Sequence, residues 1–100
     1  MIARIWQGKT KNEHSLIYKN LIENRDIPDY RKTNGFLKLT FLKRSDDEFT
    51  YFKLLTFWED LNTIKNFTGP NFEQAVSYDD DKKYLADWPG NVCHFEVFAE

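Results

Sequence analysis

The stretch LLTFWEDLNTIKNFTG, residues 54–69, begins with the alternation typical of a strand and ends with the spacing of a helix. Trp58 lies where one element passes into the other. Asp60 is a typical helix N-cap, and Gly69 followed by Pro70 ends the helix. The residues expected on its inner face are Leu61, Ile64 and Phe67. The stretch therefore predicts a strand that leads directly into an amphipathic helix, with a large aromatic side chain at the junction.

Hydrophobic alternation predicts four strands, and helical patterns fill the two long intervals between them. The strands are expected at residues 2–8, 35–44, 49–58 and 91–99. The polar residues 45–48 connect the second and third strands as a hairpin, and Trp88, Pro89 and Gly90 turn the chain into the last strand. The predicted order is βαββαβ, which indicates an α+β fold with a four-stranded antiparallel sheet.

Two charged segments help to place the helices. Thr10 followed by Glu13 predicts a capping box that opens the first helix, which should end near Asp26 before residues 27–30 turn the chain. Its inward residues are expected to include Ile17 and Leu21. The run DDDKK at residues 79–83 is more typical of a solvated helix start than of a metal site.

Length and composition limit the possible function. The chain has 100 residues, of which 41% are hydrophobic, and this favours a single domain over residues 1–100. One cysteine, Cys93, cannot form an intramolecular disulfide, which fits a reducing cytoplasm. A net charge of −2 and the lack of a long apolar segment argue against nucleic acid and membrane as partners. Small molecules and protein partners remain.

Splitting the strands by residue parity predicts one apolar face and one mixed face. The helix-covered face is expected to carry Ala3, Ile5, Leu37, Leu39, Phe41, Phe52, Leu54, Cys93, Phe95 and Val97. The opposite face is expected to carry Arg4, Trp6, Phe36, Lys38, Thr40, Leu42, Tyr51, Lys53, Leu55, Phe57, His94, Glu96 and Phe98. Such a mixed face predicts a homodimer in which a second sheet covers the aromatic rings and pairs the charges. The alternative is a monomer with a mixed surface.

With the βαββαβ order, the segments IARIWQG, IPDYRKTNG and TFWEDLNTIKNF resemble the antibiotic biosynthesis monooxygenase family of ferredoxin-like domains. The resemblance spans the whole chain, and its most specific element is a Trp that closes the third strand before a helix with an inward Phe, here Trp58 and Phe67. It implies a homodimer whose sheets form an α/β barrel, with a pocket between sheet and helices in each subunit. It also implies cofactor-independent oxidation of small aromatic or polycyclic substrates by O₂. Other members of the family bind and degrade heme.

The predicted pocket residues interrupt or border the apolar rows. The candidate catalytic residues are Gln7, Trp58 and Tyr30, which would stabilise the anion of an acidic aromatic substrate. The Trp58 indole N–H is expected to orient the ligand, although Trp58 as a core residue bonded to a nearby carbonyl is equally compatible with the sequence. Tyr30 and Arg31 are expected in a loop able to close over the ligand. The candidate substrate-binding residues are Trp6, Gln7, Tyr30, Thr56, Trp58, Phe67, Phe72, Tyr78 and His94.

The residues that the resemblance associates with heme are only partly present. The heme-degrading branch uses an Asn near the end of the first strand, a Trp corresponding to Trp58, and an iron-binding His at a position occupied here by Val76. Gln7 falls at or beside the Asn position. His94 is expected to face the barrel, as a base or paired with Glu96 or a partner-chain carboxylate. No metal site and no cofactor is therefore predicted.

Two non-enzymatic functions share the βαββαβ order. An RNA-recognition module needs a Lys/Arg-Gly-aromatic pattern on a central strand, and FTYFKLLTF at residues 49–57 lacks it. A non-catalytic dimeric domain that binds or senses a small molecule is the main alternative to the cofactor-independent monooxygenase.

Overall fold

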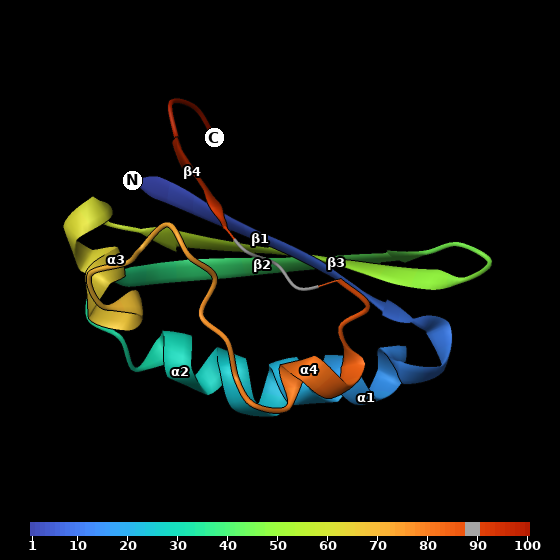
Figure 1. Ribbon diagram of the computed structural model, residues 1–100. Coiled ribbons are helices and arrows are strands. Elements are labelled where there is room, and N and C mark those ends of the chain that lie inside the picture. The colour runs from blue at the N-terminus through green and yellow to red at the C-terminus, as the bar shows by residue number, and fades with distance from the viewer. Residues whose placement is uncertain (88–90) are drawn as a thin grey trace.

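A four-stranded antiparallel sheet forms one layer of the molecule, and helices cover one of its faces (Figure 1). The computed structural model describes residues 1–87 and 91–100, so the turn predicted at Trp88, Pro89 and Gly90 lies outside the described residues. The strands are β1 (Ile2–Lys11), β2 (Phe36–Ser45), β3 (Phe49–Trp58) and β4 (Cys93–Glu96). The helices are α1 (Ser15–Leu21), α2 (Ile27–Arg31), α3 (Leu61–Thr68) and α4 (Asp81–Tyr84). The predicted α+β class is confirmed.

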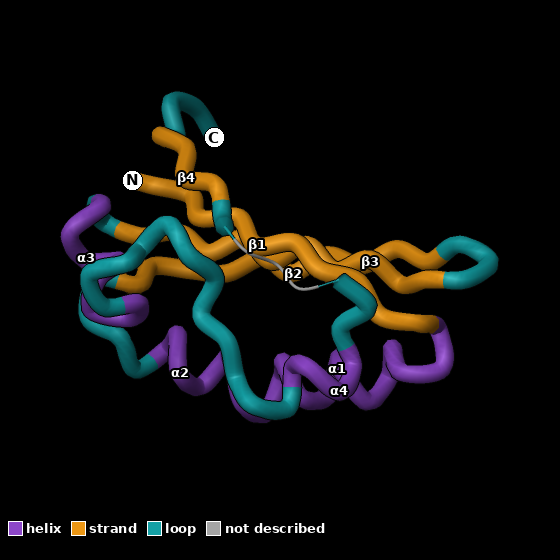
Figure 2. Tube along the Cα trace, in the orientation of Figure 1, coloured by secondary structure: helices purple, strands orange, loops and turns teal. Residues whose placement is uncertain are grey.

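The strand order across the sheet is β2-β3-β1-β4, with every neighbouring pair antiparallel. The two central strands, β1 and β3, pair over their full length, whereas β4 pairs only with Ile2–Ile5 of β1. The β2–β3 hairpin lies where it was predicted, and the Asp46 carboxylate accepts hydrogen bonds from the backbone N–H groups of Glu48 and Phe49. The long loop between α3 and α4 passes from the level of the sheet down to the helix layer (Figure 2).

The stretch at residues 54–69 folds largely as its pattern predicts. The Asp60 side chain accepts a hydrogen bond from the backbone N–H of Thr63, and the Thr63 side chain completes the capping box. Gly69 ends α3 with a φ of 75°. Ile64 is completely buried and Phe67 partly so, but Leu61 in the first turn is exposed. The inner face of α3 is therefore narrower than predicted.

The start of the first helical region differs from the prediction. Thr10 does not cap a helix, because β1 continues to Lys11 and Thr10 pairs with Thr50 inside the sheet. A 3₁₀ turn at Asn12–His14 precedes α1. Tyr18 and Ile22 are the buried residues of this region, whereas Ile17 is exposed. The buried face therefore lies one position further along the sequence than predicted, with Leu21 partly buried at its border.

The first helical region also ends later than predicted. A π-helical turn at Ile22–Asp26 leads into α2, so the helix does not end near Asp26. Pro28 lies in the first turn of α2, directly after the π-helical turn. Residues 27–30 are thus helical, and Tyr30 lies in α2 instead of a loop. The extra residue of the π turn rotates the following side chains about the helix axis, which brings both Asp26 and Tyr30 to the buried side.

The faces of the two central strands were predicted correctly for β3 and incorrectly for β1. Directly opposite residues in an antiparallel pair share a face. Arg4 is opposite Thr56 and Trp6 is opposite Leu54, so Arg4 and Trp6 face the helices. Ala3, Ile5 and Gln7 consequently lie on the uncovered face. The alternation of β1 is as predicted, but its two faces were assigned the wrong way round. A charged residue was expected to avoid the core, whereas Arg4 is buried with hydrogen bonds to backbone carbonyl oxygens.

The outer strands show the same reversal in part. His94 pairs with Arg4, which places it on the helix side, and Phe95 pairs with Ala3 on the uncovered face. In β2, an irregularity between Phe36 and Lys38 places Phe36 opposite Trp58 on the helix side, and Leu37 is exposed. The uncovered face therefore differs from the predicted one, because Arg4, Trp6, Phe36 and His94 lie on the helix side, whereas Lys38 and Lys53 remain on the uncovered face. Its apolar residues are Ala3, Ile5, Leu42, Leu55, Phe57 and Phe95.

Candidate functional site

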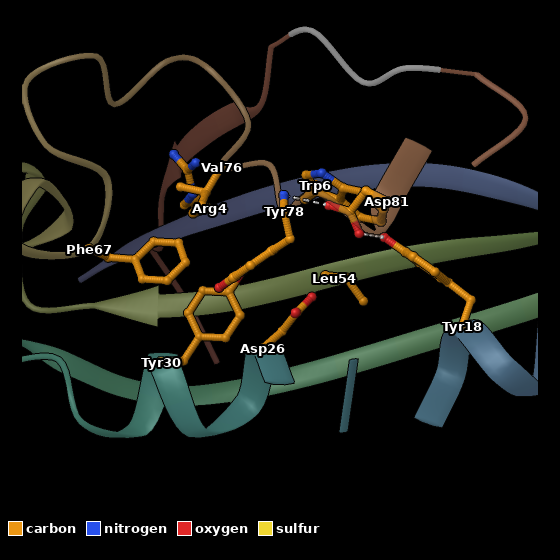
Figure 3. Close-up of a pocket in the computed structure, with 10 residues that line it drawn as sticks. All are labelled: Arg4, Trp6, Tyr18, Asp26, Tyr30, Leu54, Phe67, Val76, Tyr78 and Asp81. Atoms are coloured by element: carbon orange, nitrogen blue, oxygen red, sulfur yellow. Dashed lines mark hydrogen bonds between the residues drawn. The ribbon is translucent and has the colours of Figure 1, made fainter. Parts of the chain in front are cut away.

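A small closed cavity lies between the sheet and the helices (Figure 3). Its volume is about 10 Å³, which is room for about one water molecule. The side chains around it come from both layers and from the loop after α3. They are Arg4, Trp6, Tyr18, Asp26, Tyr30, Leu54, Phe67, Val76, Tyr78 and Asp81. Aromatic rings and buried charges therefore surround a single enclosed space.

Arg4 is the most unusual residue of this site. Only 3% of its surface is exposed. One Nη atom donates to the carbonyl oxygen of Phe72 and also contacts His94 Nε2 at 2.9 Å, and the other donates to the carbonyl oxygen of Gln74 at 3.0 Å. Burial lowers the pKa of Arg4, with nearby Tyr30 opposing this effect. Among the described residues, no carboxylate forms an ion pair with this guanidinium.

The contact with Arg4 determines the tautomer of His94. A guanidinium only donates hydrogen bonds, so His94 Nε2 accepts and the proton of the neutral ring lies on Nδ1. Burial and the charge of Arg4 lower the pKa of His94, and Glu73 opposes them. His94 is therefore neutral near pH 7, and its ring also packs edge-on against Phe72. The expected placement of His94 in the barrel is wrong.

A second charged group closes the other side of the cavity. Arg25 donates to Asp26 at 2.6 Å and to Asp81 at 2.7 Å. Asp81 also accepts hydrogen bonds from the Tyr18 hydroxyl and from the backbone N–H of Tyr78, and both are drawn in Figure 3. Asp81 is buried, so the segment at residues 79–83 is not a uniformly solvated helix start. The hydrogen bonds of Asp81 join α4 and the preceding loop to the helix layer.

The carboxyl group of Asp26 differs from an ordinary surface carboxyl group. Burial raises the pKa of Asp26, and the hydrogen bond from Arg25 only partly offsets this effect. Burial opposes the charge of Arg25, but its hydrogen bonds to Asp26 and Asp81 outweigh burial and raise its pKa. Arg25 therefore stays cationic, and Asp26 takes up a proton at a higher pH than an ordinary surface aspartate does.

Tyr30 forms part of the aromatic wall. Its ring stacks on Phe67 with centroids 4.5 Å apart and contacts Phe36, Phe41 and Trp58. Burial raises the pKa of Tyr30, and Asp26 adds to this effect. Tyr30 is consequently a neutral phenol at physiological pH and is suited to donating a hydrogen bond.

An open depression adjoins the closed cavity. It has a volume of about 230 Å³ and shares Phe67, Val76 and Tyr78 with the cavity wall. Its other lining residues are Asp29, Lys32, Thr33 and Asn66. The Tyr78 hydroxyl donates to Asp29 at 2.6 Å, across the boundary between the two spaces. The three shared side chains thus form the partition between cavity and solvent.

The structure brings some of the predicted site residues together and separates others. Trp6, Tyr30, Phe67 and Tyr78 line the cavity. Phe72 and His94 lie beside Arg4, as described above. Gln7 is exposed on the uncovered face of the sheet, so its predicted position in the helix-side pocket is wrong. It lies instead near an open depression of about 300 Å³ with Tyr51 and Asp87.

Trp58 occupies the core beside the cavity. It is completely buried, and its indole N–H donates to the Thr56 hydroxyl at 2.9 Å. The expectation of an indole N–H that is free to bind a ligand is therefore wrong, because this N–H donates to Thr56. The ring packs against Tyr30, Phe36 and Phe67. A large aromatic residue at the strand end thus joins the sheet to α2 and α3. Any role of Trp58 in ligand binding stays a prediction.

Several residues of the site were missed by the sequence analysis. Arg4 was placed on the wrong face, and Asp26 and Asp81 were not proposed at all. One signal was available, because Asp26 continues the four-residue spacing of Tyr18 and Ile22 along one side of the helical pattern. The contact of Arg25 with Asp81 joins residues far apart in the sequence, and no local pattern predicts it.

The described residues contain no cluster of His, Cys, Asp and Glu side chains suited to a metal ion. Val76 lies in the cavity wall, where an aliphatic side chain cannot ligate iron. His14 stands apart from the cavity, edge-on to Tyr84. No described helix is long and apolar enough to cross a membrane.

Solved structures similar to this chain share its fold at low sequence identity. One named as a candidate antibiotic biosynthesis monooxygenase, from Nitrosomonas europaea, has a TM-score of 0.73 and 14% identity, with 99% of this chain and 100% of that chain covered. Another so named, from Bacillus cereus, has a TM-score of 0.68 and 15% identity, with 99% and 94% covered. No protein-family model and no curated protein sequence matches the chain.

A third similar structure has a bound tetrapyrrole. It is a mutant of MhuD with two manganese protoporphyrin IX molecules per active site, and it has a TM-score of 0.63 and 14% identity, with 100% of this chain and 97% of that chain covered. At such identities the comparison concerns the fold. The fold of this chain is that of the antibiotic biosynthesis monooxygenase structures, as the resemblance of the sequence implies.

Proposed function

We propose that this chain binds a small aromatic or polycyclic molecule between sheet and helices and oxidises it with O₂ without a metal or a flavin. The observation that supports this proposal is the enclosed space in which Arg4 and Asp26 are buried among the rings of Trp6, Tyr30 and Phe67. A buried cation and a buried carboxyl group beside aromatic rings are suited to an aromatic substrate that loses a proton.

Each of these groups has a role in the proposed reaction. The Asp26 carboxylate, whose pKa is raised by burial, accepts a proton from the substrate. Tyr30 donates a hydrogen bond to the resulting anion, and the Arg4 guanidinium provides a positive charge that favours an acidic substrate in the site. The substrate carbon supplies all four electrons to O₂. A CH₂ group becomes C=O with one oxygen atom, and the second oxygen atom leaves as water with the two hydrogens.

Substrate entry requires the partition to move. The cavity of about 10 Å³ cannot hold an aromatic ring, whereas the adjoining depression of about 230 Å³ can hold one. Rotation of Phe67, Val76 and Tyr78 would join the two spaces. The ring would then lie in the former depression, with its acidic group directed toward Arg4.

The narrow cavity also favours a second candidate function. A site that is filled by its own side chains is suited to a non-catalytic small-molecule-binding or sensory domain, which needs no space for O₂. Turnover separates the two functions, because only the oxygenase consumes O₂ in proportion to the ligand.

The uncovered sheet face supports assembly as a homodimer. Phe95, on the uncovered face, is 55% exposed, and Phe98, beyond β4, is 97% exposed. Covering these rings with a second copy removes apolar surface from water. The exposed thiol of Cys93 on the same face would stay reduced in the cytoplasm, which we propose as the location.

An oxygen-electrode screen of phenols, quinols and polycyclic ketones tests the proposed reaction. We expect one or more substrates to cause O₂ uptake by the metal-free protein. Asp26→Asn should abolish uptake, whereas Asp47→Asn, in the β2–β3 connection, should not change it. Circular dichroism checks that both variants are folded. Ligand binding without O₂ uptake would support the binding domain instead.

A further inference from the structure

Arg4 carries a buried positive charge that the described part of the protein does not neutralise. Its partners are two backbone carbonyl oxygens and a neutral imidazole. By contrast, Arg25, a partly buried guanidinium beside this site, is bound to both Asp26 and Asp81. Burying a charge without an opposite charge is costly, and dipoles recover only part of the lost hydration. An anion beside Arg4 would therefore bind favourably.

The surroundings of Arg4 limit the kind of anion. A guanidinium is a planar fork that matches the two oxygens of a carboxylate. Asp26 and Asp81 line the same cavity, so a dianion such as phosphate would meet two carboxylates as well as one cation. A single negative charge on a flat group is repelled less by these carboxylates than a dianion is, and it fits the narrow space.

The rings near Arg4 limit the rest of the ligand. Trp6, Tyr30 and Phe67 line the cavity, and the Phe72 carbonyl oxygen is itself a partner of Arg4. The Phe67 ring stacks on Tyr30 and also borders the outer depression. A planar aromatic body directed from that depression toward Arg4 would contact these rings on its faces.

We propose that the ligand of this site is an aromatic monocarboxylate whose carboxylate group binds the Arg4 guanidinium. This inference rests on the proposed function and specifies its substrate class. The carboxylate replaces the carbonyl oxygens of Phe72 and Gln74 as the partner of Arg4. Binding thus separates Arg4 from residues 72–74, the part of the loop that lies over the site.

The test uses 2-naphthoate as the probe and 2-naphthamide as its neutral isostere. Titrations followed by tryptophan fluorescence and by calorimetry should show saturable binding of the naphthoate to the wild-type protein. The amide should bind at least about tenfold more weakly, because it has no charge to pair with Arg4. Equal affinities for acid and amide, or no binding of either at millimolar concentration, would overturn the proposal.

Two arginine variants make the assignment specific to Arg4. Arg4→Met should weaken naphthoate binding at least about tenfold while leaving amide binding unchanged. Arg31→Met, at the exposed end of α2, is the matched control and should bind naphthoate as the wild type does. Arg4→Met with wild-type affinity would contradict the proposal. If this variant does not fold, the comparison of acid with amide on the wild-type protein still decides.

The outcome can be separated from that of the oxygenase proposal. Naphthoate binding through Arg4 without any O₂ uptake in the substrate screen would leave the carboxylate site standing and remove the oxygenase. O₂ uptake with neutral substrates that is unchanged in Arg4→Met would remove the carboxylate site and leave the oxygenase standing.

Discussion

Among single residues, Trp58 and Thr56 carry the most direct prediction about stability. Trp58→Phe leaves a void beside Tyr30 and Phe67 and removes the partner of the Thr56 hydroxyl. We expect a loss of about 2 kcal/mol in the free energy of unfolding, measured by urea denaturation. Naphthoate affinity should change less than threefold or so, because Trp58 does not line the cavity. A normal stability with a large loss of affinity would show that Trp58 belongs to the binding site.

His94 predicts a pH dependence of stability. Burial and Arg4 lower its pKa below the usual 6.5, so the unfolded chain takes up a proton more readily than the folded protein does. Its contribution to stability is therefore present above pH 6.5 and is lost as the pH falls from there through the folded pKa.

The measurement compares urea midpoints at about pH 7.5 and about pH 5.5. The wild-type protein should lose stability on acidification, and His94→Gln should lose less, because the amide oxygen accepts from Arg4 but does not titrate. His14→Gln is the control and should behave as the wild type does. An identical pH dependence in His94→Gln would contradict the assignment.

The sequence predicted the aromatic residues of the site better than the charged ones. Trp6, Tyr30, Phe67 and Tyr78 were found because large rings between sheet and helices are part of the core. Arg4 was misplaced because a charge inside an apolar row is normally solvated, and only the carbonyl oxygens of residues 72–74 make its burial possible. Those partners lie about 70 residues away, where strand parity gives no information.

At the level of elements, two glycines test how the helices join the sheet. Gly35 precedes β2 with a φ of 92°, and a Cβ there would lie 2.2 Å from Cβ of Thr63 in α3. Its carbonyl oxygen accepts from the backbone N–H of Glu59, which leads into α3. Gly69, at the end of α3, also has a positive φ, but a Cβ there would meet nothing within 4 Å.

Alanine at the two positions should therefore differ in effect. Gly69→Ala carries only the backbone cost of about 1 kcal/mol, whereas Gly35→Ala adds a clash and should cost about 3 kcal/mol or more. Thermal unfolding of both variants provides the comparison. Equal costs would show that α3 does not pack closely against the turn before β2.

Element boundaries show where local patterns were sufficient. Asp60, Thr63 and Gly69 define α3 through bonds within a few residues, and this helix was predicted from its caps. Thr10 offered an equally good capping pattern, but pairing with Thr50 in β3 keeps it in β1. Pairing with a neighbouring strand thus prevails over a local helix-capping pattern at Thr10.

At the scale of the whole molecule, the uncovered sheet face predicts a homodimer. Light scattering after gel filtration should give about twice the 12.0 kDa chain mass. Leu55→Asp, at the centre of that face, should give a monomer, because a buried unpaired carboxylate is costly. Leu16→Asp is the control, since Leu16 is 67% exposed on α1 and should not affect the mass. A wild-type monomer at high micromolar concentration would refute the dimer.

The βαββαβ order and the sheet topology were predictable because strand alternation and two helical intervals leave few compact arrangements. The face of β1 was not, since it depends on register with β3. The corrected register moves Arg4, Trp6 and His94 to the helix side and leaves Leu55 and Phe57 on the uncovered face. A homodimer formed through this face thus does not need to pair Arg4 or His94 across the interface.

A crystal structure of the protein with 2-naphthoate tests the central claim most directly, namely that the ligand site lies between sheet and helices at Arg4. The account predicts density for the ring beside Phe67 and Tyr30, with the carboxylate on the Arg4 guanidinium and residues 72–74 displaced. Density for the ring on the uncovered sheet face, beside Phe57 or Gln7, with Arg4 still bound to the carbonyl oxygens of Phe72 and Gln74, would contradict it.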